Sequence, residues 1–394
     1  MTGPLSGVTV VDLTRLVAGD YCTSLLVALG AEVVKIEDPT RGDYIGEFGG
    51  VVNDVPVAHH LFNRGKRSVC IDLKRAEGQA ALRRLVARAD LLVESFRPGV
   101  MARLGLEPEG TMAQHPGLVW VAISAYGAES PRSHVPGHDI NYLAEAGLLD
   151  RLTGTDGRPV PPPIPLADLI GGGLIPALTA VSMLLQARLT GRGGYIDASI
   201  TDGTALLPSV LLADLVAGAP AVSGGRALLT GEYACYDVYR LIDGYAAVGA
   251  LEATFWEQLC LSIGHPEIVQ LQWDPAAQTR ARTVLSEAFA SLTKEDVAGR
   301  GLDQNACVSV VRSYEEALRA EDAVDRGTAV VANGGFLAPA LSFRIDGRQL
   351  SPAPSAPQRG EDTREVLESL GMSEAEISAL FSNGTVREPE AGPS

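Results

Sequence analysis

The stretch Gly137-His138-Asp139-Ile140-Asn141-Tyr142 places an imidazole, a carboxylate, an amide and a phenol within six residues. Such groups can accept, donate or orient protons, and loops held by a rigid scaffold are where they tend to act. A purely structural explanation is also open, because His138 and Asp139 could satisfy each other and the nearby backbone. The stretch is therefore a candidate for acid–base chemistry, which further residues must support.

Two carboxylates elsewhere in the chain strengthen this candidate. Asp168 stands just before Gly171-Gly172-Gly173 and a long apolar segment, and Glu252 follows a predicted strand. A carboxylate at a helix start is stabilised by the helix dipole, although an ordinary N-cap aspartate gives the same pattern. The pair His59-His60 lacks a third spaced ligand, so we expect it to be structural and expect no metal site.

Two kinds of chemistry suit these residues. Asp168 could attack an acyl thioester as a nucleophile and pass the acyl group on through a mixed anhydride. Alternatively, His138 and Asp168 could flank an acidic carbon, one removing a proton while the other supplies one. The first reaction needs no histidine, and no GxSxG motif points to a serine nucleophile in its place. Both reactions remain open from the residues alone.

Composition excludes several other classes of protein. The chain has 394 residues, of which 46% are hydrophobic and 20% charged, as expected for a globular protein with two or three domains. Its net charge of −16 argues against nucleic-acid or anionic-membrane binding. Five scattered cysteines without a CxxC pair predict reduced, mostly buried thiols. We see neither a signal peptide nor a membrane-spanning run, and expect a cytoplasmic protein.

One region departs from this acidic balance. Residues 61–103 contain ten basic side chains against four acidic ones. A locally basic face on an acidic protein predicts a small anionic ligand with several phosphates. For Arg83, Arg84 and Arg88, the outer face of a solvated helix is the better explanation.

The order of elements predicts an α/β fold with a parallel sheet. Residues 8–13 and 32–37 have the β-branched pattern of buried strands, and residues 21–29 between them have the pattern of a helix. The glycine fingerprint of a dinucleotide-binding fold is absent after the first strand, so NAD is not implied. Residues 91–94 form a further strand whose carboxyl end carries residues 95–99, where open sheets bind ligands.

The chain divides into a larger and a smaller predicted domain. The apolar helix 172–189 is expected to be buried all round, and a helix over 201–217, kinked at Pro208, completes a large domain over residues 1–217. Residues 218–226 form a predicted linker to a small α+β domain over 225–330, which opens with a β-hairpin. We expect residues 331–394 to return to the large domain and to end in a frayed polar tail.

Several motifs give the chain a resemblance to a known family. It resembles the family III CoA-transferase superfamily of CaiB/BaiF type over nearly its whole length, and within it most resembles the α-methylacyl-CoA racemases. The GHDINY turn and Glu252 favour the racemases, because the transferases typically carry a different residue at the histidine position. The superfamily motifs are Pro4-Leu5-Ser6-Gly7 running to Leu13, Leu29-Gly30-Ala31-Glu32 running to Glu37, Asn63-Arg64-Gly65-Lys66-Arg67-Ser68, and Phe96-Arg97-Pro98-Gly99 running to Leu106.

The resemblance implies residue roles. His138 and Asp168 would be the two catalytic bases of a racemase, with Glu252 the partner of the histidine, whereas in a transferase Asp168 would carry the acyl group. It further implies a Rossmann-like large domain, an interlocked homodimer and no cofactor, since CoA is part of the substrate. The implied CoA-contacting positions are Ile71, Asp72, Leu73, Lys74, Ser95, Arg97, Arg103, Gly137, Asp139, Ile140, Asn141 and Tyr142.

Three positions depart from the racemase pattern. Asp38 stands where racemases usually have an arginine that holds CoA phosphates, so either Lys35 or Arg64 compensates or CoA lies differently. The loop 41–57 is more like that of the transferases. Asp20 replaces a proline common near the first helix.

Together these observations predict a 2-methylacyl-CoA racemase of lipid metabolism that acts by 1,1-proton transfer, with the enolate oxygen stabilised by a backbone amide near Asp168. An acyl-CoA:carboxylate CoA-transferase that uses Asp168 is the alternative. A non-catalytic CoA-ester binding protein is a third possibility.

Overall fold

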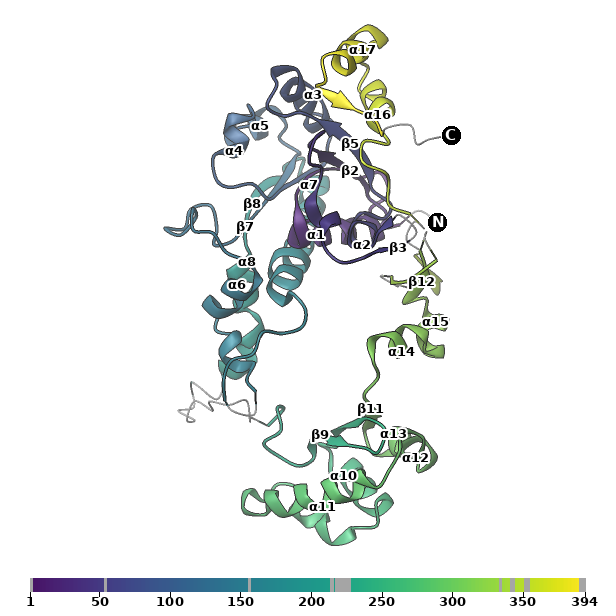
Figure 1. Ribbon diagram of the computed structural model, residues 1–394. Coiled ribbons are helices and arrows are strands. Elements are labelled where there is room, and N and C mark those ends of the chain that lie inside the picture. The colour runs from purple at the N-terminus through teal and green to yellow at the C-terminus, as the bar shows by residue number, and fades with distance from the viewer. Residues whose placement is uncertain are drawn as a thin grey trace. The chain divides into compact units, whose positions relative to one another are not determined.

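The computed structural model describes residues 3–52, 55–154, 157–212, 216, 228–332, 335–340, 344–350 and 355–389 (Figure 1). The chain folds into two compact units. The first comprises Met1–Leu148, Pro162–Val210 and Leu318–Ser394, and the second comprises Leu149–Pro161 and Leu211–Ala317. The second unit covers most of the segment predicted as the small domain (225–330). The predicted linker, 218–226, lies outside the described residues.

A seven-stranded sheet forms the centre of the first unit. All neighbouring strands are parallel except for the short edge strand β16, which runs antiparallel to β5. The predicted α/β class with a parallel sheet is therefore confirmed. In spatial order the strands are β16 (Val386–Arg387), β5 (Arg67–Ile71), β2 (Glu32–Glu37), β1 (Thr9–Leu13), β6 (Leu91–Glu94), β7 (Val119–Ser124) and β8 (Gly194–Ser199).

The strand order creates a crevice at one end of this sheet. The chain moves outward from β1 to β2 and β5, then returns to place β6 on the other side of β1. In open parallel sheets, ligands bind outside the carboxyl ends of the strands where the order reverses in this way. Residues 14–18 after β1 and residues 95–98 after β6 therefore meet at the expected ligand-binding edge.

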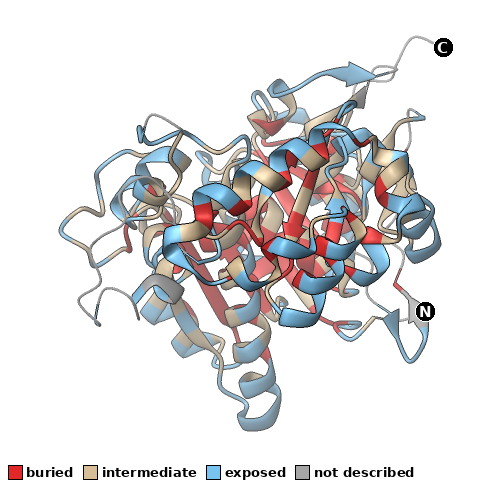
Figure 2. Ribbon diagram, turned by 90° about the horizontal axis from the view of Figure 1, so that it is seen from below, coloured by how far each residue is buried: buried red, intermediate tan, exposed pale blue. Residues whose placement is uncertain are grey.

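Helices cover both faces of this sheet, and the buried residues concentrate on its strands and on the inner faces of the helices (Figure 2). The α3 helix packs with α16 and α17 over one apolar cluster, which includes Leu82, Trp120 and Leu367. The helices of the first unit are α1 (Leu16–Ala28), α2 (Val57–Asn63), α3 (Ala76–Val86), α4 (Val100–Arg103), α5 (Pro108–Gln114), α6 (Asp139–Glu145), the π-helix η3 (Ala167–Leu174), α7 (Ile175–Thr190), α8 (Ile200–Ala205), α15 (Glu321–Arg326), α16 (Thr363–Ser369) and α17 (Glu374–Ser382).

The long helix formed by η3 and α7 is not buried all round, so that prediction is wrong. Leu178, Leu185 and Leu189 are exposed by 62%, 61% and 77%. An apolar composition on every face cannot show which face packs, and here one face lies on β7 and β8 while the three leucines stay exposed among the described residues. By length and composition the helix Ala167–Thr190 could also cross a membrane, contrary to our expectation, although core helices pass the same test.

Two predictions about the chain's later segments also differ from the structure. The predicted helix 201–217 is a short α8 followed by the 3-10 helix η4 (Leu207–Leu211), which contains Pro208; most of the remainder lies outside the described residues. Contrary to the prediction of a frayed tail, the chain keeps regular structure up to Arg387, because Val386 pairs with Ile71 at the edge of the sheet. An edge strand of two residues carries too little pattern to be recognised in a sequence.

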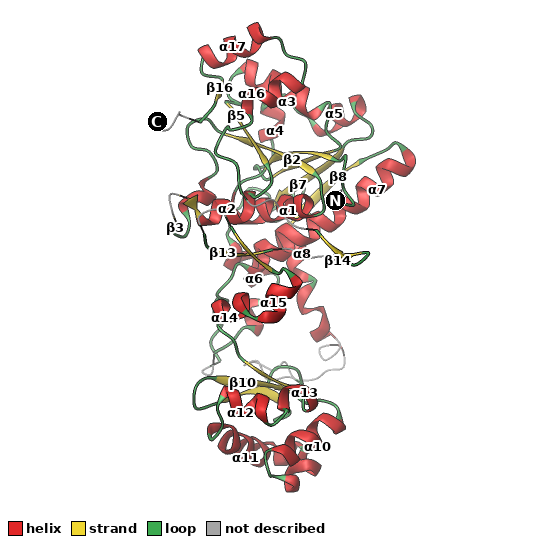
Figure 3. Cartoon of the chain, turned by 90° about the vertical axis from the view of Figure 1, so that its right-hand side faces the viewer, coloured by secondary structure: helices red, strands yellow, loops and turns green. Residues whose placement is uncertain are grey.

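The second unit is built on a three-stranded antiparallel sheet flanked by helices (Figure 3). The predicted hairpin is confirmed, with its turn at Asp243-Gly244. Trp256 is buried in the core, where the Tyr239 and Phe289 rings stack with centroids 5.3 Å apart. The elements are β9 (Tyr236–Arg240), β10 (Tyr245–Gly249), β11 (Val308–Val310), α10 (Ala253–Ser262), α11 (Gln278–Ala290), α12 (Lys294–Gly299) and α13 (Leu302–Asn305).

Short elements complete the described chain: η1 (Tyr44–Glu47), η2 (Leu149–Arg151), η5 (Pro266–Leu271), η6 (Pro275–Ala277), α14 (Tyr314–Arg319), and the two-stranded pairs β3 (Val51–Val52) with β4 (Val55–Pro56), β12 (Ala329–Val331) with β13 (Leu337–Pro339), and β14 (Arg344–Ile345) with β15 (Arg348–Gln349). All five cysteines are free thiols and four are buried, as predicted; Cys307 is exposed.

Candidate active site

A cleft of about 330 Å³ opens at the carboxyl ends of β1, β6 and β7, within the first unit. It brings together His138 and Asp168, which the sequence separates by 30 positions. The other residues that line it are Arg15, Leu16, Val17, Ala18, Ser95, Phe96, Arg97, Pro98, Ile123, Ser124, Ala125, Ser133, His134, Val135, Pro136, Gly137, Tyr142 and Ile200.

The GHDINY turn is held by its own side chains. Asn141 Oδ1 accepts a hydrogen bond from the His138 amide at 3.0 Å, and the Tyr142 hydroxyl donates to the Gly137 carbonyl at 2.5 Å. A Cβ atom at Gly137 would lie 2.7 Å from the Tyr142 ring, so only glycine allows the ring to pack there. The turn thus has a defined shape and leaves the His138 side chain exposed at the cleft.

Asp139 connects this turn to the helix that carries Asp168. Its Oδ1 atom accepts hydrogen bonds from the backbone amides of Ala167 at 2.7 Å and Asp168 at 3.0 Å. These amides belong to the first turn of η3, where backbone N–H groups have no partner within the helix. Asp139 therefore positions Asp168, a role that the sequence did not reveal because the two segments are far apart in the chain.

The Asp168 carboxyl lies in an environment that favours its protonated form. Burial, followed by the nearby charge of Asp139, raises the pKa of Asp168 to about 7. No lysine or arginine of the described residues offsets these two effects. At neutral pH both forms of Asp168 are populated, so it can donate or accept a proton.

Three consecutive glycines allow η3 to pack closely enough to bring Asp168 to the cleft. A Cβ atom at Gly171 would lie 2.2 Å from the Ile200 carbonyl oxygen of α8, and one at Gly172 would lie 2.7 Å from Ala18 of α1. Side chains at these positions would push η3 away from both helices. π-Helical segments are often found at functional sites, and this one of eight residues carries Asp168.

Glu252 lies in the second unit, as the exposed residue that precedes α10. Its predicted partnership with His138, which lies in the first unit, therefore remains a prediction.

The predicted CoA-contacting residues fall into three groups. Ser95, Arg97, Gly137 and Tyr142 line the cleft. Ile71 is buried in the core of the sheet, so only its backbone could contact a ligand. The remaining predicted contacts do not line the cleft: Asp72, Leu73, Lys74, Arg103, Asp139, Ile140 and Asn141.

Both candidates proposed to compensate for Asp38 are buried. The Lys35 side chain is only 2% exposed and is paired with Asp20 and Asp43. Arg64 is also buried and donates a hydrogen bond to the Pro339 carbonyl at 2.9 Å. How CoA is held without an arginine at position 38 remains a prediction.

Other members of the basic stretch also have structural roles. Lys66 is fully buried beside Asp12, Arg84 pairs with Glu376, and Arg88 bonds to backbone carbonyls near the end of α16. The expected basic face is therefore reduced at the cleft to Arg97, joined by Arg15, which the sequence analysis missed. The Arg15 guanidinium lies 5.5 Å from the centre of the Phe96 ring.

An open parallel sheet with acid–base groups at its switch point is the architecture of an α/β protein that binds a ligand at the carboxyl ends of its strands. The sequence profile of CoA-transferase family III matches residues 5–363, and the chain belongs to this family. The resemblance drawn from the motifs is thereby confirmed.

The relatives of the chain include both a racemase and a CoA-transferase. Alpha-methylacyl-CoA racemase of Mus musculus is 35% identical, with 97% of each chain covered. Succinyl-CoA:glutarate CoA-transferase of Mus musculus is 28% identical, covering 98% of this chain and 91% of that one. A CaiB/BaiF family protein from Brucella suis has the same fold, with a TM-score of 0.83 at 24% identity, over 94% of this chain and all of that one.

Proposed function

We propose that the chain is a 2-methylacyl-CoA racemase that inverts the α-carbon of an acyl-CoA thioester by two-base proton transfer. The observation that carries the proposal is that His138 and Asp168 line one cleft, with the pKa of Asp168 raised to about 7. A group whose pKa lies near the working pH serves well both as acid and as base. An exchange of roles between the two groups would reverse the direction of inversion.

The proposed reaction begins at the α-proton of the thioester. One group removes this proton while the other delivers a proton to the opposite face of the carbon, so that the configuration inverts and no redox change occurs. The developing enolate needs hydrogen-bond donors that are already in place. Glu252, if it reaches His138, would orient the imidazole and stabilise its charged form.

The expected enolate donors near Asp168 are already occupied. The Ala167 and Asp168 amides donate to Asp139, and the Leu169 amide donates to the Pro165 carbonyl. We therefore place the donors at the start of α1 instead, where Val17 and Ala18 line the cleft. Amides in the first turn of a helix lack helical partners and lie at its positive end.

The second candidate function is transfer of CoA between an acyl-CoA and a carboxylate, with Asp168 as the acyl-carrying nucleophile. The 28% identical transferase favours it. It makes a different demand on Asp168, which must be ionised to attack, and it gives His138 no task.

We also propose that the chain acts as a homodimer. Exposed Leu178, Leu185 and Leu189 give α7 an apolar stripe of the kind that subunit interfaces bury. Analytical ultracentrifugation of the purified protein at micromolar concentration tests this, and a monomer would contradict it.

The deciding experiment is incubation with (R)- and then (S)-2-methylacyl-CoA in deuterium oxide, followed by mass spectrometry and chiral analysis. Deuterium at the α-carbon together with inversion supports the racemase. CoA transfer to an added free acid, without exchange, supports the transferase. If neither reaction occurs although acyl-CoA binds, both the racemase and the transferase proposals are contradicted.

Variants separate the roles within this experiment. His138→Ala should abolish inversion but leave a transferase partly active, whereas Asp168→Ala should abolish either activity. Glu252→Gln tests whether the carboxylate of the second unit assists the histidine. His115→Ala, which lies outside the cleft, is the matched control and should behave as the unmodified protein.

A further inference from the structure

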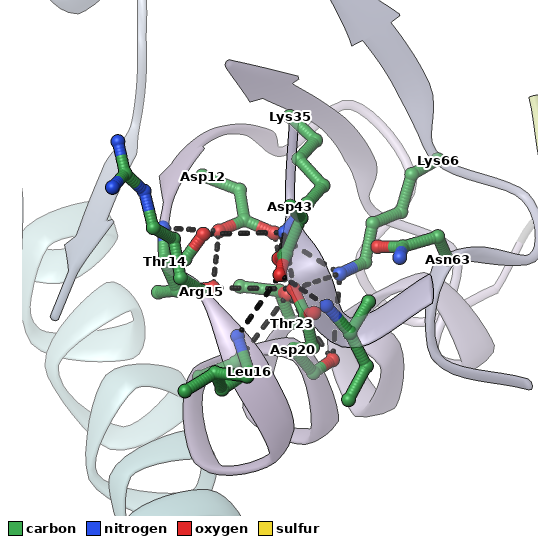
Figure 4. A network of polar contacts seen from close by, with 12 residues as sticks. Asp12, Thr14, Arg15, Leu16, Asp20, Thr23, Lys35, Asp43, Asn63 and Lys66 are labelled. Carbon is green, nitrogen blue, oxygen red and sulfur yellow. Dashed lines mark hydrogen bonds and ion pairs between the residues drawn. The ribbon is translucent and has the colours of Figure 1, made fainter. Parts of the chain in front are cut away.

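Beside the cleft lies a cluster of five charged side chains that the proposed reaction does not use (Figure 4). Asp12 comes from β1, Asp20 from α1, Lys35 from β2, Asp43 from the residue before η1, and Lys66 from the turn before β5. None of the five side chains is more than 2% exposed. The charges must therefore balance among themselves, because burial of an uncompensated charge is very costly.

The lysines and Asp12 have complete sets of partners. Lys35 Nζ contacts Asp20 Oδ1, Asp43 Oδ2 at 2.8 Å and the Thr14 carbonyl at 3.2 Å. Lys66 Nζ lies 3.1 Å from Asp12 Oδ2 and 3.4 Å from Asp20 Oδ1.

The hydroxyl groups nearby complete the shell of Asp12. Thr14 donates to its Oδ1 atom at 2.6 Å, and Thr23 donates to its Oδ2 atom at 2.7 Å. Every acceptor atom of Asp12 is thus paired, as suits an ionised carboxylate.

Asp20 and Asp43 differ from Asp12 in this respect. Oδ2 of Asp20 is buried without a hydrogen-bond donor, and Oδ2 of Asp43 has only its ion-pair contact with Lys35 Nζ at 2.8 Å. The two carboxyl groups contact the same Lys35 ammonium group, and a hydrogen bond from Asp20 helps to lower the pKa of Asp43. Such a bond can form only if one of them carries a proton.

The charge balance requires the same proton. Three carboxylates facing two ammonium groups would leave one negative charge in a site closed to water. We propose that Asp20 and Asp43 share one proton, and that this protonated pair positions the Arg15–Ala18 wall of the cleft. The proposal concerns binding in the cleft generally, so it does not depend on which of the two reactions the cleft supports.

Titration directions agree with this placement of the proton. Burial raises the pKa of Asp20 to about 7, and the charges of Asp43 and Asp12 act in the same sense, against those of Lys35 and Lys66. Burial also acts to raise the pKa of Asp43, but Lys35 and the bond from Asp20 hold it well below its usual value. The proton therefore resides mainly on Asp20.

The cluster reaches the cleft through the backbone of Leu16. Asp43 Oδ1 accepts hydrogen bonds from the amides of Leu16 at 3.3 Å and Ile45 at 2.9 Å. Leu16 has a φ of 65°, a left-handed conformation that side-chain-bearing residues rarely adopt and that the surroundings must maintain. Loss of the shared proton would set Asp20 and Asp43 against each other and weaken the hold of Asp43 on Leu16.

Difference infrared spectroscopy tests the shared proton. The difference spectrum, obtained by subtracting the spectrum of Asp20→Asn from that of the unmodified protein, should show the band of one protonated carboxyl group at pH 6. This band should disappear by about pH 8.5. Asp43→Asn should remove the same signal, because two lysines then face two aspartates and no proton is needed. Asp303→Asn, an exposed aspartate of the second unit, is the control and should show none.

The outcomes of this test are distinct. Persistence of the signal in Asp43→Asn would contradict sharing, and absence of any difference for Asp20→Asn would contradict the proton altogether. If Asp20→Asn does not fold, the difference spectrum between the unmodified protein and Asp43→Asn over the same pH range still decides, because the signal of Asp168 cancels in it.

Binding of acetyl-CoA, measured by isothermal titration calorimetry at pH 6 and pH 8.5, tests the positioning role. The unmodified protein should bind about tenfold more weakly at the higher pH. Asp20→Asn should not show this loss, because its amide still donates to Asp43 and cannot ionise. Equal affinity at both pH values in the unmodified protein would contradict the positioning role. Failure of acetyl-CoA to bind at either pH would contradict that role and, separately, the proposed function, while leaving the infrared result on the proton intact.

Discussion

Two aspartates of the first unit have their pKa values raised to about 7, yet they occupy opposite kinds of site. Asp168 lies at the wall of an open cleft, where burial and Asp139 act on it without a cation to oppose them. Asp20 lies in a closed cluster, where burial outweighs the attraction of two lysines. Burial is thus the main cause of the raised pKa in both places, unopposed by a cation at Asp168 and opposed by two lysines at Asp20.

The comparison shows that a raised pKa does not by itself identify a catalytic group. Asp168 lines the open cleft together with His138, so a change in its protonation can act on a ligand. Asp20 touches only other protein groups, so a change in its protonation can act only through the residues it positions. Access, more than the pKa, distinguishes the two roles.

The largest effect on activity is expected from a substitution of Asp168 in the cleft. Asp168→Asn removes the carboxyl that either reaction requires, and we expect activity to fall by about 10²–10⁴-fold, the usual contribution of a positioned acid–base group. Deuterium exchange and CoA transfer, measured separately, report this loss. Full activity in either assay would remove Asp168 from the mechanism.

The same variant should gain stability at alkaline pH. The pKa of Asp168 is raised from 3.8 to about 7 in the folded state, so the folded chain binds more protons than the unfolded chain between these values. Stability from this group is thus greatest at low pH and falls as pH rises to about 7. Asparagine does not titrate, and at pH 8 it should be more stable by about 1–3 kcal/mol, allowing for solvent at this half-buried group. Urea unfolding at pH 5 and pH 8 measures the difference.

Substitutions in the buried cluster around Asp20 should change the stability of the protein rather than its reaction. Lys66→Met leaves Asp12 and Asp20 without one of their two lysines, and removal of one partner from a buried pair typically costs about 3–5 kcal/mol. Arg84→Met, which breaks the exposed pair with Glu376, should cost about 0–1 kcal/mol. Thermal unfolding of both variants tests the contrast, and equal losses would show that burial does not govern these pairs.

The sequence predicted the sheet well but the cluster not at all. Residues 32–37 and 91–94 were predicted as strands, and β2 and β6 have these bounds, because short β-branched runs between turn residues give a strong local signal. The helix predicted from Tyr21 begins instead at Leu16. Gly19 and Asp20 look like loop residues, and only the cluster explains why an aspartate is accommodated inside that helix.

The candidate site shows the same division. His138 and Asp168 could be identified from local motifs and the family resemblance, and the structure places both at one cleft. The bonds from Asp139 to the start of η3 join segments 28 and 29 positions apart, for which a single sequence carries no signal. The partners of Lys35, which are Asp20 and Asp43, were missed for the same reason, since nothing local indicates them.

A smaller change in the cleft tests how much Asp139 contributes to the raised pKa of Asp168. Asp139→Asn keeps an oxygen that can accept from the Ala167 and Asp168 amides but removes a negative charge near Asp168. The pKa of Asp168 should then fall toward its ordinary value, although burial, the larger cause, still raises it. The pH–rate profile should shift its Asp168-dependent limb to lower pH. An unshifted profile with normal folding would leave burial as the sole cause.

The smallest effect is expected at Tyr142, which holds the turn without taking part in the chemistry. Tyr142→Phe removes the hydrogen bond to the Gly137 carbonyl while retaining the ring that packs edge-on against Tyr126. A single hydrogen bond contributes about 0.5–1.5 kcal/mol to stability, and the loss should lie in that range. Because Asn141 still anchors the His138 amide, kcat should change little. A large fall in kcat at normal stability would instead show that the Tyr142 hydroxyl acts on the ligand, which would extend the reactive site beyond His138 and Asp168.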